Sequence, residues 1–522
     1  MKKEEERLMN GSLLDEKYDV IVIGGGLGGL TCAAVLAKRG YKVILFEQHH
    51  KVGGYATTFQ RKAPNGDVFN LEASIHTIVG CNESGFISQT LKEVGTKEDV
   101  EFIDLGPNHL KIVLPDRTID FPFRQDDFIR MLTTQFPEEE QNIQKFFNDL
   151  DNFWALFPDI RAKALFQEFS MDFRELPEFM KDYNRSLQSV LSSYFVDGRI
   201  CDILYAPLSY YGLGVSDIDF LKYAVSMREI FREKSYWIKG GSQNLSNAFT
   251  SAIEKHGGRV RVNSMVKKIL IERNRAIGVE LEDGSIYHSD FIVSNADATL
   301  TFFQLVGTEN LPEEFVKDLS EMTATLSFFE VYLGLDESFE IPDTFSSSFE
   351  VVILEEYGIH KVSEVTETEG FPIAGITNYT TFDPSLAPNG KQIITILAPM
   401  QMGDLKRDWG VSNYKERNEK YQRKKEAIIT ELIEMAEIVY PELSKHILVK
   451  EAATPLTYQR YTLNRNGSLG FDIEYKRLPQ QTPVECLYLA GGWTEPHGGV
   501  LGVIISGKQA AEMVHDQVKR SK

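Results

Sequence analysis

The residues with the clearest chemical purpose lie near the N-terminus, in a glycine-rich turn. Gly24, Gly26 and Gly29 match the GxGxxG spacing of nucleotide-binding turns. The first glycine permits a tight turn, the second lets the backbone approach a pyrophosphate, and the third allows a helix to pack closely on a strand. The helix that follows offers free N–H groups and the positive end of its dipole to phosphates. This spacing predicts a dinucleotide site.

An acidic residue and a second pair of glycines follow this turn. Glu47 lies 18 residues after Gly29, near the usual interval of about 20, at the end of the next predicted strand. A carboxylate in this place accepts hydrogen bonds from ribose hydroxyl groups. Gly53 and Gly54 come shortly after it. The alternative is an ordinary glycine-rich loop with a surface Glu.

The elements around these residues alternate between strands and helices. Residues 19–23 and 42–46 are the apolar runs of buried parallel strands, and a helix is predicted between them over residues 28–39. Together they have the size of a βαβ unit. Similar pieces recur later in the chain, at residues 291–294, 487–490 and 502–518.

The predicted fold class is α/β, with a Rossmann-like domain built from discontinuous segments. We expect this domain to comprise residues 18–85, 239–300 and 484–522. A mixed β-sheet domain for the substrate is expected over residues 100–124 and 301–483. Residues 125–238 lack strong strand signals for most of their length and have aromatic residues at helical spacing, which predicts a helical lid or insertion.

The composition of the chain limits the classes of molecule that the protein is expected to bind. The chain has 522 residues and a formal net charge of −20, which argues against nucleic acid because phosphate binding needs a basic surface. The four cysteines form no CxxC pair, so no metal site is predicted. The apolar run 20–37 is too rich in glycine for a membrane span, and we expect a cytoplasmic protein. Residues 227–237 mix basic and aromatic side chains, as a peripheral membrane contact would, or as an ordinary helix end would.

Several stretches of the chain resemble a known family. The Gly53-Gly54 pair after Glu47 is similar to that of FAD-dependent oxidoreductases with two dinucleotide-binding domains. Within them, residues 237–245, 277–296 and 489–502 resemble the phytoene desaturase, carotenoid isomerase and retinol saturase group. The chain departs from that pattern at Tyr55, usually Arg, and from the desaturases at His497 and Leu501, usually Gly and Pro. Tyr55 and His497, together with the stretch around Tyr458, favour the isomerase and saturase members of the group.

This resemblance implies bound FAD. It places Gly24, Gly26, Gly29, Glu47, Gly53 and Gly54 at the diphosphate and ribose, Val266 at the adenine, and Gly492, Thr494 and Gly502 around the flavin. The dipole of the last helix would stabilise the reduced, anionic ring. No second GxGxxG follows a strand, so NAD(P) is expected only as a transient electron partner, with a quinone or oxygen as alternatives.

The implied substrate is a long, apolar polyene lipid: a carotenoid, a retinoid or an unsaturated fatty acid. Hydride transfer at flavin N5 would give desaturation, saturation or cis–trans isomerisation, which the sequence does not separate. Glu72 and His76 share a face because they lie four residues apart, and Glu495 and His497 lie in the segment over the flavin. All four are candidates for catalytic proton transfer, and structural hydrogen bonding beside the cofactor is the alternative.

Two rival functions use the same fold. A flavin amine oxidase would have an aromatic cage near the flavin. In this chain Trp493 and scattered tyrosines hint at such a cage. A prenyl-lipid escort protein would carry a lipid without redox chemistry and would need no intact flavin site. All the glycines of the expected flavin site are present together with Glu47, which argues against an escort protein.

Overall fold

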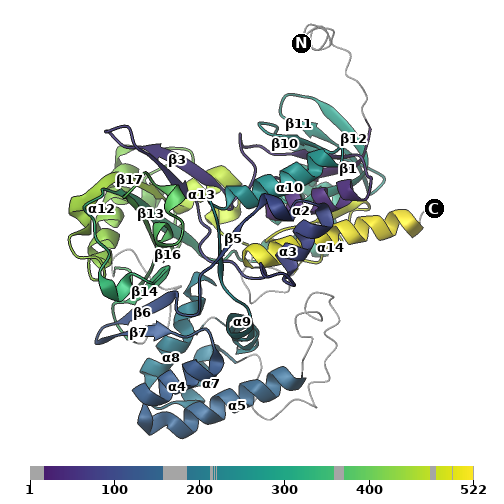
Figure 1. The fold of residues 1–522 in the computed structure, drawn as a ribbon. Coiled ribbons are helices and arrows are strands. Elements are labelled where there is room, and N and C mark those ends of the chain that lie inside the picture. Colours follow the sequence, from purple (N-terminus) through teal and green to yellow (C-terminus); the bar gives the residue numbers. More distant parts are fainter. Residues whose placement is uncertain are drawn as a thin grey trace.

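The computed structural model describes residues 17–156, 185–211, 215–216, 218, 220–357, 370–470, 478–495 and 498–520. It has two halves, each built on a seven-stranded sheet, with a group of helices beside both of them (Figure 1). The predicted α/β class, with a Rossmann-like part made from distant chain segments, is confirmed. The division into three domains stays a prediction.

The first sheet has the strand order β10-β11-β12-β1-β2-β9, and β18 pairs with β12. Its members are β1 (Tyr18–Ile23), β2 (Val43–Phe46), β9 (Arg259–Arg261), β10 (Val266–Glu272), β11 (Arg275–Leu281), β12 (Ile286–Ser294) and β18 (Leu487–Leu489). β1, β2, β9, β12 and β18 pair in parallel, as their apolar runs predict. Their carboxyl ends therefore meet at one edge, where ligands of open α/β sheets bind.

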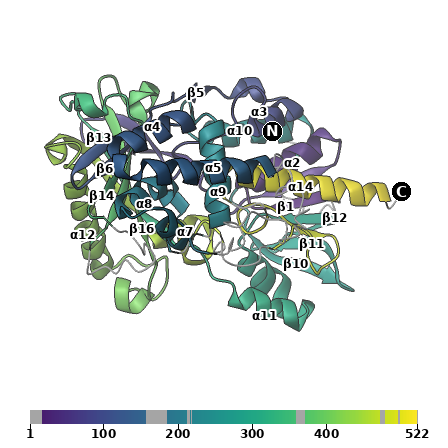
Figure 2. The ribbon, with the colours of Figure 1, turned by 90° about the horizontal axis from the view of Figure 1, so that it is seen from below.

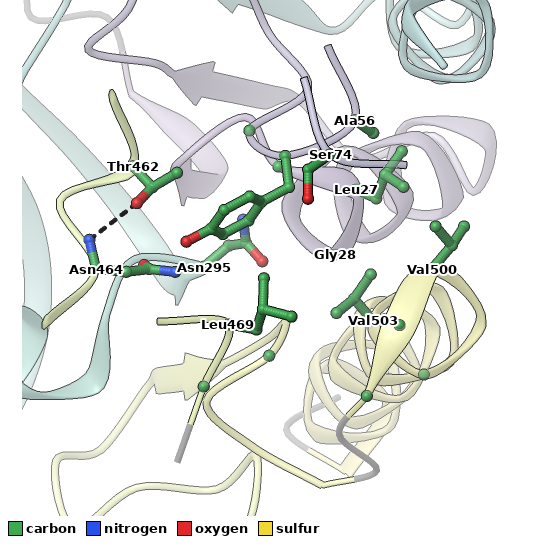
Figure 3. Close-up of a pocket in the computed structure, with 18 of the residues that line it drawn as sticks. Leu27, Gly28, Ala56, Ser74, Asn295, Thr462, Asn464, Leu469, Val500 and Val503 are labelled. Atoms are coloured by element: carbon green, nitrogen blue, oxygen red, sulfur yellow. Dashed lines mark hydrogen bonds between the residues drawn. The ribbon is translucent and has the colours of Figure 1, made fainter. Parts of the chain in front are cut away.

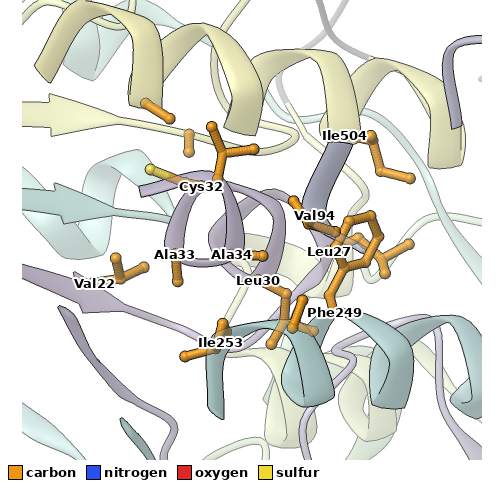
Figure 4. Packing of buried hydrophobic residues seen from close by; sticks show 14 of the residues in the cluster. Val22, Leu27, Leu30, Cys32, Ala33, Ala34, Val94, Phe249, Ile253 and Ile504 are labelled. Atoms are coloured by element: carbon orange, nitrogen blue, oxygen red, sulfur yellow. The ribbon is translucent and has the colours of Figure 1, made fainter. Parts of the chain in front are cut away.

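Helices cover this sheet closely. They are α2 (Leu27–Lys38), α3 (Phe86–Val94), α10 (Gln243–Lys255) and α14 (Gly499–Arg520). Leu30 of α2 packs near Phe249 and Ile253 of α10 (Figure 4). On the other side α2 meets α14, where a β-carbon on Gly507 would lie 2.2 Å from the backbone oxygen of Gly28. Small residues at this crossing let the two helices approach until their backbones touch.

The second sheet has the order β17-β13-β16-β15-β14-β6-β7. Its strands are β6 (Leu110–Leu114), β7 (Arg117–Phe121), β13 (Ser327–Leu335), β14 (Glu350–Leu354), β15 (Ile373–Asn378), β16 (Gln392–Met400) and β17 (Ile447–Ala453). One face packs on α12 (Glu419–Ala436). The other face, which carries Phe328, Tyr332 and Leu397, points to the junction with the first half. There the two-stranded sheets β3 (Thr58–Lys62) with β4 (Val68–Glu72), and β5 (Phe102–Asp104) with β8 (Tyr236–Ile238), lie between the halves.

The helical group contains α4 (Gln125–Gln135), α5 (Glu140–Leu156), α7 (Leu187–Tyr194), α8 (Gly198–Tyr205) and α9 (Phe220–Arg232). Seen from below, it lies across the boundary between the two halves (Figure 2). Described aromatic residues of this stretch form its core, with Phe121 of the second sheet joining Phe128 and Phe147.

The stretch 227–237 is partly exposed and partly buried: Arg232 and Lys234 are exposed, and a peripheral membrane contact here stays a prediction. Arg228, Tyr236 and Trp237 are buried, and the indole N–H of Trp237 donates a hydrogen bond to Asp383 at 3.0 Å. The two aromatic rings lie in the interior because β8 pairs with β5. Among the helices of the described residues, none combines the length and the hydropathy that a bilayer crossing requires.

Candidate functional site

A cavity of about 670 Å³ lies where the two halves and the helical group meet. This volume is within the range of small-molecule sites, about 300–1,000 Å³. At one end the cavity is lined by the glycine turn after β1 and by the ends of β2 and β12. At the other it is lined by the second sheet and by α9. Figure 3 shows part of this cavity between Leu27, Ser74, Leu469 and Val503.

The glycine turn forms a cradle of bare backbone. Gly24 has φ +92°, a conformation that side chains disfavour. A β-carbon on Gly26 would lie 2.8 Å from the amide nitrogen of Asn295, and one on Gly29 would lie 2.2 Å from the oxygen of Gly24. Gly24 and Gly26 line the cavity, whereas Gly29 serves the packing of α2, as its place in the motif predicts.

The second glycine pair lies beside the first. The backbone N–H of Gly53 donates to the oxygen of Gly25 at 2.7 Å, and Gly54 has φ +60°. Both residues line the cavity. The predicted extension of the dinucleotide cradle therefore fits the structure, because two glycine segments expose backbone to the same space.

Glu47 lies at the end of β2 and lines the cavity. One carboxylate oxygen accepts the N–H of Gly25 and the other accepts the N–H of His49, each at 2.7 Å. Burial raises the pKa of Glu47, and these hydrogen bonds oppose the rise. Each oxygen keeps a second lone pair, so Glu47 can fix the turn and still accept a ribose hydroxyl group.

The other predicted cofactor residues divide into two groups. Val266, Gly492 and Gly502 line the cavity. Thr494 does not line it: its hydroxyl group donates to the backbone oxygen of Leu478 at 2.6 Å and is buried. The hydroxyl group of Thr494 therefore fixes the chain after Trp493, and a role for Thr494 at the flavin stays a prediction.

The described candidates for proton transfer do not all line the cavity. Of the described residues among them, His76 lines the cavity, and Glu72 and Glu495 do not. The backbone N–H of Glu495 donates to Leu478 at 3.1 Å, which holds this segment against its neighbour. His497 lies outside the described residues.

Glu72 has a structural place. Its carboxyl group accepts hydrogen bonds from the backbone N–H and hydroxyl group of Ser242 and from the hydroxyl group of Thr58. Ser242 begins α10, so Glu72 ties β4 to that helix. Burial raises the pKa of Glu72 to about 7, against the opposing effect of these bonds. The geometry favours the alternative of structural hydrogen bonding for Glu72.

His76 lies in the loop after β4, between the two halves. Its Nδ1 is 2.6 Å from the hydroxyl oxygen of Thr377, and its ring stacks on Tyr379. The hydroxyl group of Tyr379 donates to the backbone oxygen of Ile75 at 2.8 Å, which holds the same loop. Burial lowers the pKa of His76 to about 4, so the imidazole is neutral near pH 7.

Among the cavity residues that were not expected as site residues are Asn295 and Tyr55. Asn295 follows β12, and its amide lies against Gly26, Gly28 and Gly491 (Figure 3). Its position at the carboxyl end of a buried parallel strand is a signal that could have found it. Tyr55, which stands where the family usually has Arg, donates its hydroxyl group to the backbone oxygens of Gly467 and Ser468 at 3.0 and 2.8 Å. It thereby ties the glycine cradle to the segment that leaves α13 (Pro455–Thr462).

The parallel sheet, the paired glycine segments and the cavity at the strand ends define a dinucleotide-binding α/β protein. The chain belongs to the family of flavin containing amine oxidoreductases, whose model matches residues 27–515. The expected membership in the FAD-dependent superfamily of phytoene desaturases, carotenoid isomerases and retinol saturases is confirmed.

The similar proteins cover almost the whole chain. The chloroplastic prolycopene isomerase of Daucus carota is 26% identical, over 95% of this chain and 80% of its own. The all-trans-retinol 13,14-reductase of Macaca fascicularis is 25% identical, over 94% and 84%. Among solved structures, an oxidoreductase from Methanosarcina mazei aligns with a TM-score of 0.64 at 20% identity, over 95% of this chain and 100% of that one. A putrescine oxidase aligns with 0.62 at 14%, over 96% and 99%, and shares the fold.

Proposed function

We propose that this protein is an FAD-dependent enzyme acting on carbon–carbon double bonds of an apolar polyene lipid. One observation carries the proposal: a single cavity joins a dinucleotide cradle to apolar walls. Relatives named for carotenoid and retinol chemistry support it, at 24–26% identity along nearly the whole chain. Desaturation, saturation and cis–trans isomerisation all lie within the proposal.

The residues present fit FAD. Gly24, Gly26, Gly53 and Gly54 would hold the diphosphate, since β-carbons there would fill the cradle or strain the backbone. Glu47 would hold the ribose, Val266 the adenine, and the backbone at Gly492 and Gly502 the flavin. When bound, FAD supplies a hydride acceptor or donor for one carbon atom of the polyene. NAD(P), a quinone or oxygen would exchange electrons transiently in a net desaturation or saturation.

The protein's own residues orient the polyene and exclude water. Leu208, Val225 and Ile230 from the helical group face the same cavity as Phe328 and Leu397 from the second sheet. A dry, apolar wall of this kind suits a conjugated chain and strengthens electrostatic interactions inside the site. His76, neutral and held by Thr377, is the predicted catalytic side chain that we retain for proton transfer.

The test measures the polyenes of cells and the colour of the purified protein. Cells with and without the protein are extracted and their polyenes are compared, and the absorption spectrum of the purified protein is recorded. The proposal expects a yellow protein and a shifted polyene profile. A colourless protein that carries unaltered lipid would support the escort function instead. A yellow protein with an unchanged polyene profile, whose flavin is bleached by amines, would support an amine oxidase.

A further inference from the structure

Asn295 lies at the dinucleotide end of the cavity and lines it. It follows β12, and its backbone N–H donates to the oxygen of Ile23 at 2.8 Å, which places it beside the start of the glycine turn. β-Carbons added to Gly26, Gly28 and Gly491 would each clash with its amide group. The amide therefore occupies space that three glycines from two distant segments leave open (Figure 3).

The Nδ2 atom of Asn295 lies where a pyrophosphate approaches such a turn. The second glycine of the motif is bare so that the pyrophosphate can come close, and Nδ2 is 2.8 Å from the place of a β-carbon on Gly26. An amide group has two N–H donors. Among the described residues the side chain makes one hydrogen bond, from Nδ2 to the oxygen of Gly24, and its 3.4 Å exceeds the usual range of about 2.7–3.2 Å. Nδ2 therefore has donor capacity left for a ligand.

Neighbouring hydroxyl groups in the cavity wall have no proton to spare. Those of Tyr55, Ser264 and Thr462 carry one proton each and donate it to backbone oxygens at 2.8, 3.1 and 2.8 Å. The described residues that line the cavity include no Lys or Arg, and Glu47 adds a carboxyl group to this end. Within the described wall, a diphosphate would be held by neutral N–H donors, and Asn295 is a side chain placed to supply one.

We propose that Asn295 binds the cofactor directly, with Nδ2 donating a hydrogen bond to a phosphate oxygen of the FAD diphosphate. This inference rests on the proposed function and adds a side chain to a cradle of glycine backbone. A hydrogen bond to an anionic oxygen is stronger than one between neutral groups. The competing role is structural, in which the amide only holds Gly24 and fills the space between the glycines.

The test compares FAD binding by two variants, Asn295→Ala and Asn295→Asp. Both lose the bond from Nδ2 to Gly24, but only the Asp variant places a carboxylate against the diphosphate. Titration of FAD into the apoprotein, followed by flavin fluorescence, should show about ten- to a hundredfold weaker binding for the Ala variant. The Asp variant should bind FAD at least about tenfold more weakly again, because like charges side by side repel. ADP, which carries the diphosphate without the flavin, should compete in the same order.

Two controls separate binding from folding. Asn247→Asp, at an exposed position on α10 in the same half, adds the same charge and should leave FAD binding unchanged. If the Asp variant folds poorly, the Ala variant decides with adenosine, which lacks the diphosphate. Adenosine should then bind to the Ala variant and to the unaltered protein alike, while ADP binds about tenfold or more weakly to the Ala variant.

The outcomes separate this inference from the proposed function. FAD affinity that is unchanged in the Ala variant, or an Asp variant that binds FAD as well as the Ala variant does, overturns the contact with the diphosphate and leaves the proposed function standing. Equal losses of ADP and adenosine affinity in the Ala variant overturn it too. An unaltered protein that binds no FAD contradicts both.

Discussion

Glu47 offers the sharpest test of the cofactor site, because the structure shows what its carboxylate does. It accepts the N–H groups of Gly25 and His49 at 2.7 Å each and lies in the cavity wall. Glu47→Ala removes these acceptors and the one proposed for the ribose. A hydrogen bond to a charged group is worth about 1.5–3 kcal/mol. Loss of the ribose bond alone should therefore weaken FAD binding by about ten- to a hundredfold.

The assay titrates FAD into the apoprotein and follows the quenching of flavin fluorescence. Glu47→Gln should fall between the unaltered protein and the Ala variant, since its amide group can satisfy one of the two N–H donors and opposes the other. Glu282→Gln, an exposed residue of the same half, is the control for a change of charge. If Glu47→Ala binds FAD as tightly as the unaltered protein, the place given to Glu47 is wrong.

The remaining predictions concern the identity of the cofactor, stability and catalysis. Denatured protein should release FAD and not FMN, as chromatography of the supernatant will show. Burial raises the pKa of Glu72 from 4.5 to about 7, so the stability this group contributes is full below pH 4.5 and is lost as the pH rises to 7. In urea unfolding, the free energy of unfolding of Glu72→Gln, relative to that of the unaltered protein, should therefore rise by about 3 kcal/mol between about pH 5 and pH 8. Gly28→Ala places a β-carbon 2.7 Å from the α-carbon of Gly491 and should cost about 1–3 kcal/mol in the same assay, whereas Gly198→Ala meets nothing within 4 Å and should cost far less. His76→Gln should slow net redox turnover by about 10²–10⁴-fold and isomerisation much less, while Glu495→Gln leaves both unchanged in stopped-flow and product assays.

The dinucleotide end of the site was predictable because its signals are local. The interval from Gly24 to Glu47 is one strand, one turn, one helix and one strand, so spacing along the chain translates directly into positions in space. The structure places Gly24, Gly26, Glu47, Gly53 and Gly54 on one cavity wall. Their roles toward FAD stay predictions until binding is measured.

The substrate end was not predictable, because its residues meet only through tertiary packing. His76 and Thr377 are 301 residues apart in the chain and are joined by a 2.6 Å contact. Glu350 lines the same cavity and lies opposite Thr377 through the register of β14 and β15, which the sequence does not specify. Glu72, four residues from His76, points instead to Ser242, since the even spacing that placed both on one face holds only within a single regular strand or helix, and β4 ends at Glu72.

The central claim is that one cavity brings a flavin and a polyene together for reaction. The most direct measurement mixes the anaerobic, FAD-loaded protein, in its oxidised form and after reduction with dithionite, with polyenes or with amines such as putrescine. Flavin absorbance is followed by stopped flow and the polyenes are analysed by chromatography. The account predicts that polyenes change the flavin absorbance or emerge as altered isomers or redox products, and that amines leave the flavin unchanged. Bleaching by amines alone, with every polyene recovered intact, would contradict it.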